Sequence, residues 1–232
     1  MSTSRPDIPQ PDAVVFDLDG TLVDTVERRI ESWMRVFAEE GIATDRREVA
    51  GLIGADGRRV ARVVAEAAGA RMDDARAEAV DRRAGEHYDQ LNVDPVPLPG
   101  AHRLLAALEA SALRWAIATS SRRDQTTESI AALRLDEPPR IVDGSHVEHA
   151  KPAPDLLLRA AEELGVEPER TWYVGDATWD MRAAVAAEMP AIGVTTGAVD
   201  GDALRAAGAR LVVGSLEELH EMMLATGVLS VG

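Results

Sequence analysis

The chain has 232 residues, so it can hold one large domain, or a core domain with a smaller insertion. Of its residues 46% are hydrophobic and only 3% aromatic, so the hydrophobic core must be built mainly from Ala, Leu and Val. It contains no cysteine, which excludes disulfides, thiolate metal sites and a cysteine nucleophile and fits a reducing, cytoplasmic setting. Its formal net charge of −15 disfavours nucleic acid and anionic membranes as partners.

The N-terminal part combines a polar tail with a short strand. Residues 1–11 contain Ser and Pro but no apolar segment, so they predict a disordered tail rather than a signal peptide. The apolar run Ala13–Phe16 then predicts a short buried strand. No apolar run in the chain approaches the roughly 20 residues needed to cross a bilayer.

Two aspartates stand just past this first strand. Strand alternation turns Asp17 and Asp19 to the same side, at the carboxyl end of the strand, where an open α/β sheet binds its ligands. Carboxylates this close repel each other unless a cation or a shared proton compensates. Gly20 then permits a sharp change of backbone direction. Taken alone, the pattern is equally typical of an acidic loop after a core strand.

Helical periodicity then continues without a strand across residues 25–97. The expected helices run from the capping residue Thr25 to about Glu40, from Arg46 to Leu52, from Arg58 to Ala68, and from Asp73 to about Leu91. A Pro-rich linker over residues 94–100 breaks the pattern. Because this stretch interrupts the sheet after its first strand, we expect residues 25–97 to form a helical cap, and residues 12–24 and 98–232 to form the core.

Strands and helices alternate over the rest of the chain. The expected strands are Arg114–Ala118, Ile141–Val142, Thr171–Val174, Ala191–Val194 and Arg210–Val213, and the expected helices are Ala101–Ala110, Asp124–Leu133, Asp155–Leu164, Trp179–Ala187 and Leu216–Leu224. This alternation predicts an α/β fold with a Rossmann-like parallel sheet, right-handed crossovers and helices on both faces.

Polar residues recur where these strands end. They are Thr119, Ser120, Lys151, Asp176 and Asp180. Each alone is also typical of a turn, a helix cap or a solvated surface. At one edge of a parallel sheet, together with Asp17 and Asp19, they would supply the carboxylates, hydroxyl, ammonium and backbone amides that magnesium-dependent phosphoryl transfer uses. Because the chain has neither cysteine nor a Ser-centred elbow motif, Asp17 is the strongest nucleophile candidate.

Four segments resemble, in order and spacing, the motifs of the haloacid dehalogenase superfamily, and the match covers nearly all of the chain. They are Asp17–Asp24 with its paired aspartates, Thr119–Ser121, Lys151–Pro152, and Gly175–Asp176 followed by Asp180. The helical insertion after the first motif resembles the cap of the phosphoglycolate phosphatase and β-phosphoglucomutase group.

This resemblance implies a role for each acidic residue. Asp17 would attack phosphorus and bind Mg²⁺, while Asp19 would be the general acid/base and touch the metal through its backbone carbonyl. Asp176 would be a direct metal ligand, and Asp180 a ligand through water or a partner for Lys151. The presence of Asp19 indicates phosphate ester chemistry, since dehalogenases proper and phosphonate hydrolases of the superfamily lack it.

The remaining motif residues are implied to bind substrate. Thr119 and the backbone amide of Ser120 would hold phosphoryl oxygens, with Gly20 as a further substrate-binding candidate. Lys151 would bridge the nucleophile and the phosphate.

Several arginines are candidates for gripping a second anionic group of the substrate. Arg58 and Arg59 follow a glycine-rich turn that resembles the family's specificity loop, and Arg123 lies just beyond the Thr-Ser-Ser segment, as does Arg122. The alternative for Arg58 and Arg59 is a solvated helix face. Arg29 stands where β-phosphoglucomutases carry a histidine, which favours a hydrolase over a mutase.

Two further residues bear on the site's surroundings. Trp179 lies between two of the predicted metal ligands and is expected to wall the cleft. Glu188 stands where relatives usually have glycine, which puts the detail of that helix end in doubt.

The sequence thus predicts a magnesium-dependent phosphatase, monomeric or homodimeric, that acts on a small phosphorylated metabolite such as phosphoglycolate, a sugar phosphate or a nucleotide. The alternatives are a phosphomutase of the β-phosphoglucomutase type and a non-catalytic binding module with the same fold.

Overall fold

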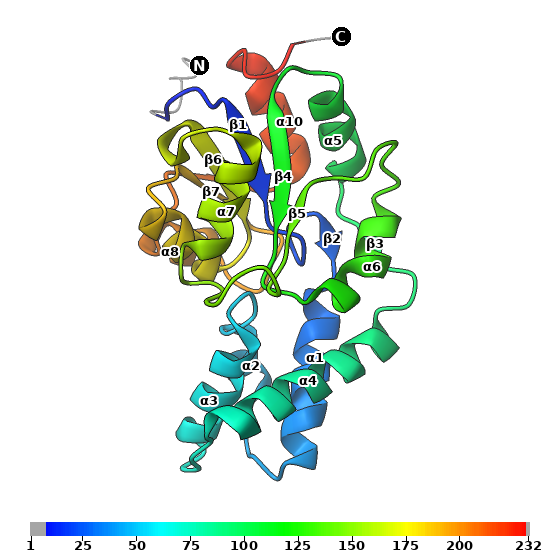
Figure 1. The fold of residues 1–232 in the computed structure, drawn as a ribbon, viewed down its shortest axis with the longest axis vertical. Helices are drawn as coiled ribbons and strands as arrows, with labels where there is room; N and C mark the ends of the chain where they lie inside the picture. Colours follow the sequence, from blue (N-terminus) through cyan, green and yellow to red (C-terminus); the bar gives the residue numbers. More distant parts are fainter. Residues whose placement is uncertain (1–7, 231–232) are drawn as a thin grey trace.

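The computed structural model describes residues 8–230, so residues 1–7 of the predicted tail lie outside the described residues. At its centre is a six-stranded sheet (Figure 1) with the order β5 (Ile141–Val142), β4 (Arg114–Ala118), β1 (Ala13–Phe16), β6 (Thr171–Gly175), β7 (Ala191–Val194) and β8 (Leu211–Val213). Every neighbouring pair in the sheet is parallel. The predicted α/β class and parallel sheet are therefore confirmed, with β1 in the middle, between β4 and β6.

Helices cover both faces of this sheet, as predicted. One face packs against α5 (Ala101–Glu109), α6 (Arg123–Ala132) and α10 (Leu216–Ala225). The other packs against α7 (Asp155–Leu164), α8 (Thr178–Ala186) and α9 (Gly201–Ala206). Along β1 the side chains alternate between the two layers, with Val14 and Phe16 on the first face and Ala13 and Val15 on the second. Every residue of β1 is fully buried, which fixes the position of the loop that follows it.

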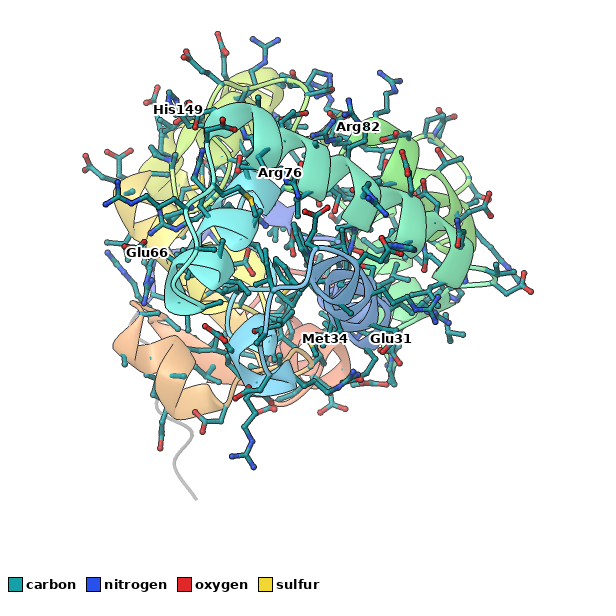
Figure 2. All side chains as sticks on the ribbon, turned by 90° about the horizontal axis from the view of Figure 1, so that it is seen from below. Glu31, Met34, Glu66, Arg76, Arg82 and His149 are labelled. Atoms are coloured by element: carbon teal, nitrogen blue, oxygen red, sulfur yellow. The ribbon has the colours of Figure 1, made fainter. Side chains whose placement is uncertain are left out.

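The insertion after β1 consists of helices gathered beyond the end of the sheet (Figure 1). These are α1 (Val26–Glu39), α2 (Arg46–Ala50), α3 (Gly57–Ala67) and α4 (Asp74–Leu91). They share an apolar cluster of their own, which includes Trp33, Val36, Val60 and Val80. Figure 2 views them from below, where charged side chains such as Glu66 and Arg82 project from their outer side. Among residues 8–230, no helix is both long enough and apolar enough to cross a bilayer.

Two features differ from the sequence prediction, and a third, at Glu188, supplies the detail of a helix end that the sequence left open. The chain enters and leaves the helical insertion through an antiparallel pair, β2 (Val23–Asp24) and β3 (Val96–Pro97), neither of which was predicted. Strand β3 lies in the Pro-rich linker, whose prolines predict a break in regular structure. Helix α9 has only six residues and was also not predicted. Glu188, just past α8, adopts the left-handed conformation that usually takes glycine, with φ of 60°.

Candidate active site

The polar segments that follow separate strands meet at one edge of the sheet. Because β4, β1 and β6 are neighbours in parallel, their carboxyl ends bring Thr119, Asp17 and Asp176 together. A cavity of about 60 Å³ opens there, lined by Asp17, Asp19, Thr119, Ser120 and Lys151 and, from the opposite side, by residues of the helical insertion. This edge, between the sheet and α1–α4, is the candidate active site.

Lys151 is the only lysine in a chain with 25 Lys and Arg residues, and its side chain is completely buried. Its Nζ donates to Asp17 Oδ1 at 2.6 Å, to Asp180 Oδ1 at 2.7 Å and to the hydroxyl of Tyr173 at 3.1 Å. Burial alone disfavours the ammonium, but the charges of Asp17 and Asp180 outweigh it and hold the pKa of Lys151 well above its ordinary value. The lysine is therefore a fixed positive charge that bridges two acids.

Asp17, Asp176 and Asp180 form a buried acidic cluster. Each offers a carboxylate oxygen, and these oxygens lie within 4.8 Å of one another. Burial raises the pKa of Asp17 to about 7 against the opposing charge of Lys151, and burial followed by the charges of Asp180 and Asp17 raises the pKa of Asp176 well above its usual value. Such crowding is relieved by a divalent cation, and three carboxylates are the ligand type that a hard cation prefers. The residues present fit a metal ion.

Two glycines make room for Asp176 in this cluster. A Cβ at Gly20 or at Gly197 would overlap the Asp176 carboxylate. Gly20 also has a φ of 82°, which side chains rarely adopt, and its carbonyl oxygen accepts from the Thr196 hydroxyl at 2.6 Å. The structure therefore places Gly20 against the acidic cluster, and it does not line the cavity as a substrate-binding residue would.

The Asp19 carboxylate points away from the acidic cluster, toward the helical insertion. Its Oδ1 accepts from the hydroxyls of Thr25 at 2.7 Å and Tyr88 at 3.0 Å, and its Oδ2 from Ser121 Oγ at 2.6 Å and Arg29 Nη2 at 2.9 Å. Burial acts to raise the pKa of Asp19, but the Arg29 charge and the hydroxyls of Ser121 and Thr25 outweigh it and lower the pKa. Thr25 stands at the cap position of α1 as predicted, but its hydroxyl donates to Asp19 and makes no capping hydrogen bond to the helix.

Arg29 reaches this cavity from α1 and lies over the ring of Tyr88, with Cζ 3.4 Å from the ring centroid. Its Nη1 donates to Gln125 Oε1 at 3.2 Å. Sequence reasoning identified Arg29 but missed Tyr88 and Gln125. One available signal was Gly85, a glycine inside a predicted helix, where a Cβ would overlap the Gln125 amide.

The phosphate-binding candidates also lie in the cavity wall. Thr119 is almost fully buried, and its Oγ1 accepts from the backbone N–H of Ser121 at 3.1 Å. Ser120 Oγ donates to the carbonyl oxygen of Gly54 at 3.2 Å, which joins the core loop to the glycine-rich turn of the insertion.

The structure does not bring the other predicted arginines into the cavity. Arg58 is held by the carboxylate of Asp56, with Nη2 2.9 Å from Oδ2, because Asp56 caps the start of α3 beside it. Arg59 lies over the ring of Trp179, at 5.1 Å, and Arg123 borders a separate hollow beside α6. Trp179 itself does not line the cavity, since its indole packs in the apolar cluster of the insertion and Nε1 donates to a carbonyl oxygen there at 3.0 Å.

Comparison with known proteins identifies the family. The family model for haloacid dehalogenase-like hydrolases matches residues 14–194. The chain belongs to this family. A phosphoglycolate phosphatase of Rhodospirillum rubrum is 32% identical over 194 residues, which cover 81% of this chain and 80% of that protein. The β-phosphoglucomutase of Bacillus subtilis is 32% identical over 219 residues, which cover 90% and 94% of the two chains.

A solved structure gives the same picture of this hydrolase. A hydrolase from Pseudomonas syringae superimposes with a TM-score of 0.86 at 32% identity, covering 91% of this chain and 97% of that one. The expected group of phosphoglycolate phosphatases and β-phosphoglucomutases, and an enzyme of the phosphatase type, are thereby confirmed.

Proposed function

We propose that this hydrolase is a magnesium-dependent phosphatase that hydrolyses a small phosphorylated metabolite through a phosphorylated Asp17. The observation that carries the proposal is the buried Lys151 ammonium, 2.6 Å from Asp17 and 2.7 Å from Asp180, beside an acidic cluster at the carboxyl edge of a parallel sheet. A buried arrangement of like charges is costly to fold, and it becomes favourable where a cation and an anionic substrate bind.

In the first step the Asp17 carboxylate attacks phosphorus. A bond from Asp17 to phosphorus forms as the bond to the ester oxygen breaks, and Asp19 gives that oxygen a proton. Lys151 holds the nucleophile and offsets the charge of the phosphoryl oxygens, which Thr119 and the amide of Ser120 would also bind. Magnesium, held by Asp17 and Asp176 and through water by Asp180, would neutralise further negative charge.

In the second step water attacks the aspartyl-phosphate, and Asp19 takes the proton from that water. Phosphate leaves and the Asp17 carboxylate is restored. Because Arg29 and the neighbouring hydroxyls favour the ionised form of Asp19, the observed contacts support this base role most directly.

Residues 25–97 would act as a cap over a core formed by residues 12–24 and 98–232. Two contacts support closure of α1–α4 over the site: Ser120 Oγ with the Gly54 carbonyl, and the Asp56 N–H with the Lys151 carbonyl at 3.0 Å. Such a cap would exclude water from the site during the first step.

Two alternative functions make different predictions in one experiment. Phosphate release is measured over a panel of phosphoglycolate, sugar phosphates and nucleotides, with and without Mg²⁺. We expect Mg²⁺-dependent release of phosphate from at least one ester. An isomerised sugar phosphate without free phosphate would instead indicate a mutase, for which Arg29 in place of histidine gives no support. Absence of any reaction would indicate a non-catalytic binding module.

A further inference from the structure

The side of the cavity that faces away from the acidic cluster is formed by the helical insertion and α6. Apolar side chains from the insertion, among them Trp33, Leu52 and Val60, line part of it. Two polar side chains line the same cavity, Asp81 from α4 and Gln125 from α6. The leaving group of a phosphate ester bound at Asp17 would extend toward this wall.

The cations that line this cavity are already paired with acids of the protein. Lys151 is held by Asp17 and Asp180, and Arg29 is held by Asp19 at 2.9 Å. A second negative group on the substrate, such as a carboxylate, would therefore meet no unpaired cation among the described lining residues. It would instead approach the carboxylate of Asp81, and like charges in a desolvated site repel strongly.

Asp81 and Gln125 each keep a hydrogen-bonding atom available. Asp81 Oδ2 accepts from Arg122 Nη2 at 2.7 Å, and within residues 8–230 its Oδ1 takes no hydrogen bond. Gln125 Oε1 accepts from Arg29, and within the same residues its Nε2 donates none. One atom is an acceptor and the other a donor, and hydroxyl groups of a ligand can serve either kind of partner.

Two glycines allow these side chains to reach the cavity. A Cβ at Gly57, in the first turn of α3, would overlap Asp81 Oδ1, and a Cβ at Gly85, inside α4, would overlap Gln125 Nε2. Glycine inside a helix is destabilising relative to alanine, so its use at Gly85, within α4, indicates that the close approach to Gln125 matters.

From these contacts we infer the class of substrate: a phosphate ester whose leaving group is uncharged and hydroxylated, a sugar or polyol phosphate, with Asp81 accepting from one of its hydroxyls and Gln125 donating to it. The inference rests on the proposed phosphatase function and narrows it. It disfavours carboxylated esters such as phosphoglycolate, because their carboxylate would lie near the like-charged Asp81, with no unpaired cation among the described lining residues. The indole of Trp33 would pack against the C–H face of such a leaving group.

The test compares kcat/KM for three kinds of ester with Mg²⁺ present: a panel of sugar and polyol phosphates, phosphoglycolate, and p-nitrophenyl phosphate as a generic ester. We expect the best polyol phosphate to exceed phosphoglycolate by about 100-fold or more, since a wrongly paired buried polar group discriminates strongly. Preference for phosphoglycolate would overturn the inference while leaving the phosphatase function intact. If even p-nitrophenyl phosphate is not hydrolysed, the proposed function itself fails.

Asp81→Asn provides the second arm of the test. It replaces an acceptor oxygen with a donor, so the ratio of kcat/KM for the polyol phosphate to that for p-nitrophenyl phosphate should fall about 10- to 100-fold. The kcat/KM for phosphoglycolate relative to that for the polyol phosphate should rise, because the substitution removes the Asp81 charge that repels a carboxylate and that pairs with Arg122. The matched control is Asp202→Asn, whose side chain is 96% exposed and which should leave the ratio unchanged.

A second substitution keeps the inference testable if Asp81→Asn does not fold. Gln125→Met retains the size of the side chain and removes only the amide, so the same ratio should fall. Thermal unfolding of each variant checks that it is folded. An unchanged ratio in a folded variant would contradict the assigned hydroxyl contact.

Discussion

Replacing Lys151 with methionine removes the fully buried positive charge beside the acidic cluster while keeping a stem of similar length. The side chain is fully buried and lies 2.6 Å from Asp17 and 2.7 Å from Asp180. Without it, Asp17, Asp176 and Asp180 share a buried space with no lysine to compensate. Breaking a buried ion pair from one side costs about 3–5 kcal/mol, so we expect the free energy of unfolding of Lys151→Met to fall by about that much near pH 8 without metal.

The loss should depend on pH with a definite sign. Burial already raises the pKa of Asp17 to about 7 and that of Asp176 well above its usual value, and losing the lysine removes an influence that lowers both. An acid whose pKa is raised in the folded state contributes stability that is complete below its unfolded pKa and is lost as the pH rises through its folded pKa. Parent and variant lose it alike until the pH passes the pKa of about 7 that Asp17 has in the parent, and above that pH the variant loses more. The free energy of unfolding of Lys151→Met should therefore be close to that of the parent protein at pH 5 and should fall furthest below it at pH 8.

Urea unfolding at pH 5 and pH 8, with and without Mg²⁺, measures these differences. Mg²⁺ should restore part of the lost stability at pH 8, because it supplies the missing positive charge. The control is Arg210→Met, which removes an exposed cation and should change the free energy of unfolding by less than about 0.5 kcal/mol. A stability of Lys151→Met equal to that of the parent at pH 8 without metal would refute the reasoning.

Three further expectations concern the acidic cluster and the end of α8. Gly20→Ala should abolish the stabilisation by Mg²⁺ that thermal unfolding measures, because the added Cβ would displace Asp176. The control is Gly41→Ala, which should retain that stabilisation, since Gly41 also has a positive φ but has open space where the Cβ would lie. Mg²⁺ affinity, measured by calorimetry, should tighten from pH 6 to pH 8 because Asp17, with its pKa of about 7, must lose its proton; a flat profile would argue against Asp17 as a ligand. Glu188→Gly should stabilise the fold by about 1 kcal/mol by relieving the left-handed backbone, whereas Glu188→Ala should not.

The positions of Asp17, Thr119 and Asp176 were predictable because each follows a strand with a clear apolar pattern. The run Ala13–Phe16 is buried along its whole length, and parallel topology then forces Asp17, Thr119 and Asp176 to one edge. The predictions failed at β2 and β3, whose two residues include Asp24 and Pro97 respectively. The equally short β5 was predicted because Ile141 and Val142 are both apolar and β-branched.

The contacts within the insertion were harder to predict because they depend on how helices cross. Tyr88 meets Asp19 only because α4 packs across α1, and helix periodicity alone does not fix that crossing. Arg58 had the right position in the sequence, but its own cap residue, Asp56, holds the guanidinium. Local hydrogen bonding of this kind competes with ligand binding and leaves no trace in motif spacing.

The central claim is that Asp17 becomes phosphorylated during turnover. Acid quenching of the Asp19→Asn variant with p-nitrophenyl phosphate and Mg²⁺, followed by mass spectrometry of its peptides, tests this directly. The p-nitrophenolate leaving group needs no proton from Asp19, and the variant lacks the base that would remove the phosphoryl group. We predict a hydroxylamine-sensitive phosphoryl group on Asp17 and no turnover by Asp17→Asn. Phosphate on another residue, or full activity of Asp17→Asn, would contradict the mechanism.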